Sequence, residues 1–189
     1  AYLTPPHTRC QQRLDARLEI TPMPVVLTET PDVYRNVRAY FEIASAHDEL
    51  LVRASSLVHT RPPEPAASQL PWEAVREQFV YHAGAQWHPA AEFIYPSVHV
   101  HPGAAFADYA APSFTPGRPL IDAARDLMQR VHRDFTYASL TTDVGTPAIE
   151  ALEQRRGVCQ DFSHVMLACL RSLGLPARYV SGYLLTQPP

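Results

Sequence analysis

The first 60 residues alternate between apolar and polar side chains. The alternation is clearest over residues 14–20, where Leu14, Ala16, Leu18 and Ile20 are separated by charged residues. A period of two predicts a β-strand with one buried face. Similar runs lie at 40–43 and 50–54, and turn-forming residues at 30–32 and 46–48 separate them. We therefore predict a β-rich N-terminal domain over residues 1–60, a small antiparallel sheet or sandwich that carries no chemistry.

The composition changes after this domain. Residues 61–71 are rich in Pro, Ala, Glu and Ser, a mixture that neither pairs nor buries well. This predicts a Pro-rich linker at 61–71 and a second domain over 72–189. In the first part of that domain we expect a short amphipathic helix from Trp72 to about Tyr81, and then a strand or an extended arm over 93–101.

Helical spacing dominates the second half of the chain. Apolar residues three and four apart, from Leu120 to Val131, predict a helix that opens at Pro119 and runs into residues 135–137. A shorter helix is predicted after Thr146 and Pro147, with Thr146 as the N-cap and Pro147 at the first helical position.

A third helix is predicted around a cysteine. Apolar residues between 162 and 173 fall on one helical face, and Gly174 with Pro176 ends the pattern. The helix therefore begins at or next to Cys159. Residues 177–185, which follow, are predicted to form a strand.

Composition narrows the class of protein. With 189 residues and 46% hydrophobic content, the chain can bury a sizeable core. No apolar stretch approaches the roughly 18 residues that a membrane helix needs. A net charge of -3, with no arginine cluster longer than a pair, argues against a nucleic-acid partner. Three widely spaced cysteines make neither a disulfide framework nor a CxxC metal site, so we predict a soluble protein of a reducing compartment, the cytoplasm.

Cys159 is the candidate nucleophile. The first N–H groups of a helix lack partners and carry partial positive charge, which favours a thiolate and can hold an oxyanion. Gly157, two residues earlier, permits a close approach of the backbone. The other two cysteines are assigned to core positions: Cys169 lies in the middle of the apolar helical face, and Cys10 lies in the strand-rich region.

A cysteine nucleophile requires a base, normally histidine. His164 is near in sequence, but five residues turn a helix by about 500°, so its side chain should not meet that of Cys159. Asp161 is expected to be a first-turn carboxylate that the helix dipole favours. His99 and His101 could share a strand face as metal ligands, but no third ligand is near them. The residues alone thus predict a nucleophile without its partner.

The segments 156–164 and 170–183 closely resemble the nucleophile helix and following strand of the bacterial transglutaminase-like family, often described as cysteine proteases. Weaker similarities cover much of the remaining chain, at 3–5, 12, 18–22, 32–36, 47–52, 135–137 and 142–147. The resemblance implies an α+β fold in which a β-rich N-terminal domain precedes a papain-like transglutaminase core. It also implies that the chain is truncated at both ends. The family's catalytic His and Asp lie on strands after this one, and residues up to Pro189 include no segment that matches them. The first strand of the family's N-terminal region also has no match.

The resemblance implies thiol-dependent acyl transfer on the amide bonds of a peptide or protein, with Cys159 as the catalytic nucleophile and no cofactor or metal. We expect residues 1–189 alone to have little or no activity. The alternative is a non-enzymatic scaffold or interaction module that keeps the fold. Exposed sheet edges are expected to favour homo-oligomers. Since all 16 basic residues are arginine, these residues cannot serve as their own lysine acceptor.

Overall fold

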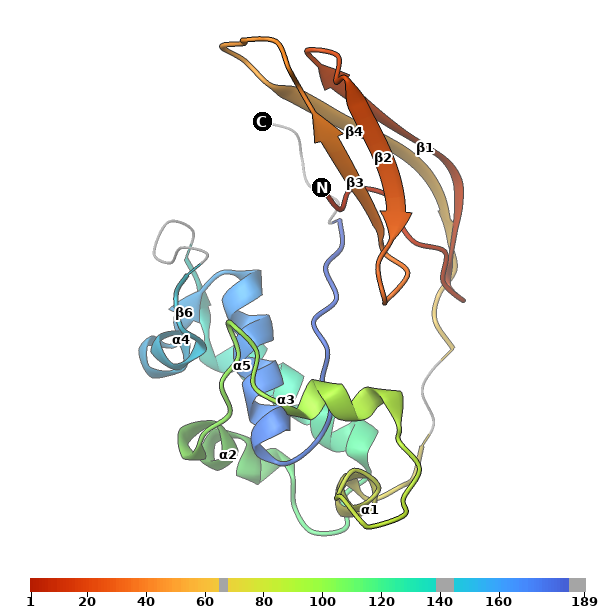
Figure 1. Cartoon of the computed structure of the whole chain (residues 1–189). Coiled ribbons are helices and arrows are strands. Elements are labelled where there is room, and N and C mark those ends of the chain that lie inside the picture. The colour runs from red at the N-terminus through yellow and green to blue at the C-terminus, as the bar shows by residue number, and fades with distance from the viewer. Residues whose placement is uncertain (65–67, 139–144, 184–189) are drawn as a thin grey trace. The chain divides into compact units, whose positions relative to one another are not determined.

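The computed structural model describes residues 1–64, 68–138 and 145–183. The chain forms two compact units, Ala1–Pro65 and Ala66–Pro189. The division falls inside the Pro-rich segment 61–71. The fold is α+β, because strands make up the N-terminal unit and helices dominate the C-terminal unit (Figure 1).

The N-terminal unit contains two antiparallel pairs of strands. β1 (Gln11–Thr21) pairs with β4 (Leu51–Thr60), and β2 (Val26–Pro31) pairs with β3 (Val37–Glu42). The predicted alternation is visible in β1, where Leu18 lies opposite Ala54 and Ile20 opposite Val52. A bulge between Arg13 and Asp15 breaks the register, and it leaves the Leu14 side chain 56% exposed.

β2 was not predicted, because Thr30, Pro31 and Asp32 have the composition of a turn. Pro31 instead ends β2 opposite Val37, a position at which an edge strand tolerates proline. The turn begins one residue later. There the carboxylate of Asp32 accepts hydrogen bonds from the N–H groups of Tyr34 and Asn36, each at 2.8 Å.

The C-terminal unit is built from short helices around one central helix, α5. This unit also contains a short parallel ladder, in which Thr136 pairs with Arg156 and Tyr137 pairs with Gly157. In chain order its elements are α1 (Trp72–Glu77), η1 (Pro89–Ile94), α2 (Ala104–Ala110), η2 (Ala111–Ser113), α3 (Leu120–Asp134), β5 (Thr136–Tyr137), α4 (Ala148–Gln154), β6 (Arg156–Gly157) and α5 (Cys159–Ser172).

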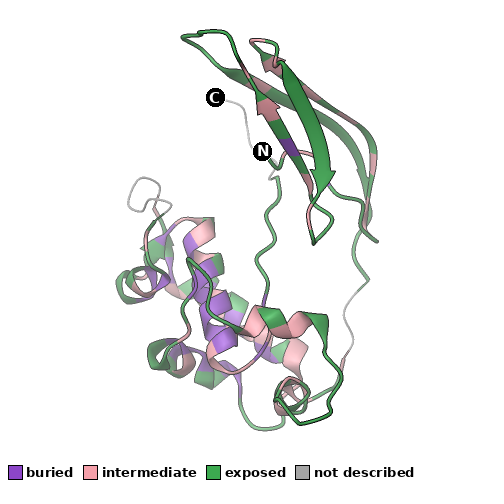
Figure 2. Ribbon diagram, in the orientation of Figure 1, coloured by how far each residue is buried: buried purple, intermediate pink, exposed green. Residues whose placement is uncertain are grey.

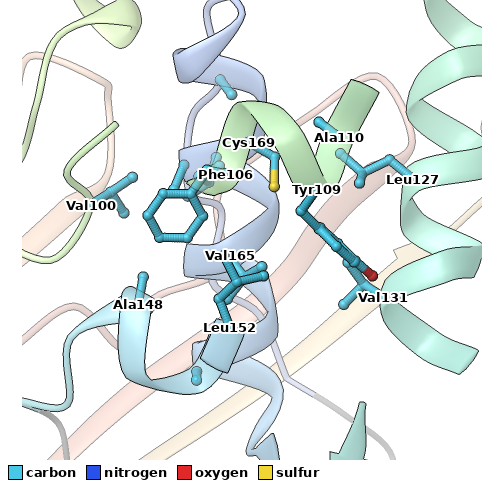
Figure 3. Close-up of a cluster of buried hydrophobic side chains, with 14 of the residues drawn as sticks. Val100, Phe106, Tyr109, Ala110, Leu127, Val131, Ala148, Leu152, Val165 and Cys169 are labelled. Carbon is cyan, nitrogen blue, oxygen red and sulfur yellow. The ribbon is translucent and has the colours of Figure 1, made fainter. Parts of the chain in front are cut away.

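The hydrophobic core lies in this unit. Side chains from α2, α3 and α4 converge on Val165 and Cys169 of α5 (Figure 3). Buried residues follow the length of α5 (Figure 2), as its predicted apolar face requires. Gly174 adopts φ 75° just after the helix, and the Leu175 N–H donates to the Leu170 carbonyl. The predicted end of the helix is therefore confirmed.

The strand alternative for residues 93–101 is wrong, and so is the strand predicted from residue 177, over its described residues. Residues 93 and 94 belong to η1, and a single isolated bridge joins Ser97 to Val100. Pro96 removes a backbone donor here, which disfavours a ladder. Residues 177–183 form no strand, because an alternating pattern becomes a strand only beside a hydrogen-bonding neighbour. The last two residues of that prediction, 184 and 185, lie outside the described residues.

Two helix boundaries differ from the prediction. The N-cap of α4 is Pro147, with extended backbone, so Thr146 is not the cap. α1 ends at Glu77 instead of continuing to Tyr81. Within the described residues, no helix is both long and apolar enough to span a bilayer.

Candidate functional site

Cys159 is the first residue of α5, and its side chain is exposed. The preceding residue, Val158, has extended backbone at φ -108° and ψ 177° and is the N-cap. The predicted start of the helix is confirmed. The thiol therefore lies at the end of a 14-residue helix, where unpaired N–H groups favour negative charge.

A buried carboxylate fixes the turn before Cys159. Asp161 is only 2% exposed, and its Oδ2 accepts the Val158 N–H at 2.8 Å. A Cβ atom on Gly157 would lie 2.6 Å from the same oxygen, so only glycine fits beside it. Asp161 is the first-turn carboxylate that the sequence predicts, and it also orders the residues that lead into the helix.

A short parallel ladder also holds the backbone that precedes Cys159. The Thr136 N–H donates to the Arg155 carbonyl, and the Ala138 N–H donates to the Gly157 carbonyl, both at 2.9 Å. These bonds join β5 to β6. The backbone that delivers Cys159 is thus bonded at three successive points.

His164 is buried on a different part of α5, with 7% of its surface exposed. Its ring stacks on His99, with centroids 5.5 Å apart and an interplanar angle of 5°, and it also contacts Tyr179. Burial lowers the pKa of His164 below its usual 6.5, and the charge of His99 lowers it further, whereas Asp161 opposes the shift. Over residues 1–64, 68–138 and 145–183, no histidine is hydrogen-bonded to Cys159.

A hollow of about 540 Å³ lies beside this histidine pair. His99, Gln160, His164 and Tyr179 contribute to its wall. Arg171 anchors the surrounding chain, since its guanidinium donates to the Ala177 carbonyl at 2.8 and 3.1 Å and to the Tyr95 carbonyl and Ser97 Oγ. One of the wall residues, Gln160, directly follows Cys159 in the sequence.

A metal site at His99 and His101, which the sequence offered without a third ligand, finds no geometric support. Residues 99 and 101 lie on no strand, so the shared strand face is absent, and His99 stacks on His164. The part of the chain that the structure describes has no group of three or more metal-binding side chains.

The other two cysteines occupy different environments. Cys169 is fully buried, and burial raises the pKa of its thiol to about 12, which confirms its assignment to the core. Cys10 is only half-buried, in the turn before β1. Its assignment to a core position is wrong, because among the described residues the N-terminal unit fully buries only Pro5 and Ala39.

The sequence reasoning missed Arg155. This residue ends α4 in the left-handed conformation, at φ 54°, and its side chain contacts the rings of Tyr109 and Phe135. One signal was present: the helix ends with neither Gly nor Asn at this position, so an ordinary residue must take the left-handed conformation.

Two family models match the chain. Residues 1–59 match the bacterial transglutaminase-like N-terminal region, and residues 107–188 match the transglutaminase-like superfamily. The chain is therefore similar to the bacterial transglutaminase-like family in both of its units. The match to the superfamily core includes Cys159 and the whole of α5.

Mycobacterial relatives extend the comparison. Uncharacterized proteins of Mycobacterium tuberculosis and Mycobacterium bovis are 40% identical over 196 residues, which cover 100% of this chain and 60% of each relative. An uncharacterized protein of Mycobacterium leprae is 36% identical over 153 residues, 81% of this chain and 52% of the relative. The chain thus spans 60% or less of the length of these curated relatives.

A solved structure has the same fold. It is a Cytophaga hutchinsonii protein described as a "Putative Cysteine Protease", with a TM-score of 0.60 and 18% identity. The match covers 90% of this chain and 56% of that chain. At this identity the likeness bears on the fold alone.

Proposed function

We propose that the full-length protein is a thiol-dependent acyl-transfer enzyme that acts on amide bonds of peptides or proteins, with Cys159 as its nucleophile. The observation that carries the proposal is an exposed cysteine at the first position of a long helix. The fixed turn before it supports the proposal, since a nucleophile must be held in one geometry to react. The match of residues 107–188 to the transglutaminase-like superfamily agrees with this chemistry.

The reaction has two halves. The Cys159 sulfur attacks the amide carbonyl carbon, a C–S bond forms, and the carbonyl electron pair moves to oxygen. The C–N bond then breaks, and the amine leaves with a proton from a general acid. Water or a second amine attacks the thioester, and the thiol is released. No metal or nucleotide takes part.

The backbone at the head of α5 is suited to hold the oxyanion. The Val158 N–H already donates to Asp161, so it is not a free donor. The Cys159 N–H belongs to the first turn, where no intrahelical acceptor exists. This N–H is therefore the proposed oxyanion donor, and the helix field adds to its effect.

Substitution of the nucleophile tests the proposal. In the full-length protein, Cys159→Ser should lower the release or exchange of amines from a peptide pool by at least about a hundredfold, because the attacking thiolate is lost. Cys10→Ser is the matched control, because Cys10 lies in the other unit, and it should retain activity. Equal turnover by Cys159→Ser and the control would contradict the proposal.

Alkylation separates the enzyme from the scaffold alternative. We expect iodoacetamide to modify Cys159 at pH 7 about tenfold faster than it modifies free cysteine, because a nucleophilic cysteine at a helix N-terminus is more reactive than an ordinary thiol. A folded, full-length protein whose Cys159 behaves as a free thiol would instead favour a scaffold or interaction module. For residues 1–189 alone we expect little turnover, since no described histidine is bonded to Cys159 and the leaving amine requires an acid.

We further propose that copies of the chain associate through sheet edges and that the protein works in the cytoplasm. Among the described residues, β2 pairs only with β3 and β1 only with β4, so each pair has unpaired backbone groups at an edge. All three cysteines are free thiols, which agrees with a reducing compartment.

A further inference from the structure

We propose that Arg155 is a positioning residue for Cys159, because its side chain ties the turn before the nucleophile to the aromatic core. The proposal rests on the proposed function, in which Cys159 is the nucleophile. It assigns to Arg155 an effect on the reactivity of Cys159 in addition to any effect on stability.

The guanidinium of Arg155 is held by aromatic rings. Its Cζ atom lies 4.2 Å from the ring centroid of Tyr109 and 5.2 Å from that of Phe135. A cation at this distance is attracted by the electron-rich face of a ring. The buried Nη1 atom has no hydrogen-bond acceptor within the described residues. Because Nη1 makes no hydrogen bond there, the contacts with the two rings hold this side chain in place.

Tyr109 is itself fixed. Its hydroxyl donates to Asp134 Oδ2 at 3.0 Å, and Arg130 donates to its carbonyl at 2.8 Å. The Cζ atom of Arg130 lies 4.6 Å from the same ring. Burial, followed by the bond to Asp134, raises the pKa of Tyr109 to about 12, so the hydroxyl keeps its proton at neutral pH. The ring is a rigid platform that links α2 to α3.

The backbone of Arg155 carries this constraint to the nucleophile. Its φ of 54° and ψ of 35° define a left-handed conformation that residues other than glycine seldom adopt. Its carbonyl accepts from Thr136, the Gly157 carbonyl accepts from Ala138, and the Val158 N–H donates to Asp161. The side chain of Arg155 is the contact that ties this turn to the aromatic core.

A comparison of adjacent arginines tests the proposal in the full-length protein. Arg155→Met removes the cation and keeps an unbranched side chain. Arg156→Met makes the same charge change one residue closer to Cys159, at an exposed position. The measurements are the pH profile of site-specific iodoacetamide alkylation of Cys159, hydrogen exchange at the Gly157 and Val158 amides, and the thermal midpoint.

We expect Arg155→Met to slow alkylation at pH 7 by about tenfold, because the turn before Cys159 loses its contact with the aromatic core and no longer holds the sulfur in one position. Exchange at Gly157 and Val158 should become faster. Arg156→Met should change the rate by roughly twofold or less, because an exposed charge is screened. Arg155→Lys should restore part of the rate, since an ammonium also binds aromatic faces, although it lacks the planar guanidinium.

The opposite result is equally clear. If Arg155→Met lowers the thermal midpoint but leaves the alkylation profile and the exchange rates at wild-type values, Arg155 is only a structural residue and the proposal is overturned. A wild-type profile typical of a free thiol contradicts the proposed function instead, and the exchange rates still decide the role of Arg155. Should Arg155→Met fail to fold, Arg155→Gly replaces it, because glycine adopts the left-handed conformation without strain.

Discussion

At the scale of single residues, the turn before α5 depends on Gly157 and Asp161. Gly157 has φ 155°, and its missing Cβ leaves room for the carboxylate of Asp161. That carboxylate is buried and bonds the Val158 N–H, which compensates its burial. Neither residue needs to touch a substrate to matter, because together they determine where the Cys159 sulfur lies.

Replacement of Gly157 should be costly. In Gly157→Ala the new Cβ would clash with Asp161 at 2.6 Å, so the carboxylate or the turn must shift. We expect a loss of about 2 kcal/mol in the free energy of unfolding, measured by urea denaturation, together with slower alkylation of Cys159. Gly182→Ala is the matched control, since its Cβ would meet nothing within 4 Å. Its effect should stay within about 0.5 kcal/mol, and equal effects of the two substitutions would contradict this account.

At the scale of elements, α5 combines two different environments. Its head exposes Cys159, whereas further along it His164 stacks on His99 and contacts Tyr179. Arg171, near its end, bonds the chain at Tyr95, Ser97 and Ala177. One helix therefore holds both the candidate nucleophile and the wall of the hollow.

The stability of this helix should depend on pH through His164. Burial and the charges of His99 and Arg171 lower its pKa in the folded state, and the charge of Asp161 opposes them. Below about pH 6.5 the unfolded chain binds a proton at His164 that the folded chain binds less readily. The stability linked to His164 is therefore fully present above about pH 6.5. It falls as the pH drops toward the lowered pKa that His164 has in the folded state.

Urea denaturation at pH 7.5 and 5.5 measures this effect. His164→Gln should lose less stability than the wild type over that interval. His132→Gln is the control, because His132 is exposed in the last turn of α3, and it should lose as much stability as the wild type. Identical pH dependence for the wild type and His164→Gln would contradict the assignment.

At the scale of the whole molecule, the two units differ in how much they bury. Of the buried apolar residues that the structure describes, only Pro5 and Ala39 belong to Ala1–Pro65, and the others belong to Ala66–Pro189. The C-terminal unit has a core around α5, whereas the N-terminal unit depends on its backbone ladders. Exposed strands with little core are typical sites of association.

We expect the molar mass, measured by light scattering, to rise with protein concentration. Leu27→Lys places a charge in β2, where Leu27 is 48% exposed, and it should weaken association. Met23→Lys is the control, because Met23 is 85% exposed and lies outside the strands. A strictly monomeric mass over the whole working range would exclude association through these edges.

Local pattern by itself determined the elements whose signals are periodic. The alternation over 14–20 predicted β1, and the apolar face over 162–173 predicted a helix that begins at Cys159 and ends before Gly174. Such signals are local, because each residue type has a preference that its near neighbours reinforce. Residues 177–183, the described part of the strand predicted over 177–185, form no strand for the same reason, since a strand also needs a neighbour that the pattern does not specify.

Only the tertiary structure decided how the site is held. The contact of Arg155 with Tyr109 joins residues 46 positions apart in the sequence, and the stack of His99 on His164 joins residues 65 apart. These pairs form because α2 packs on α4 and the segment 97–100 packs on α5, and no local preference encodes that proximity. The sequence therefore locates the candidate nucleophile, while the packing of distant segments determines the geometry around it.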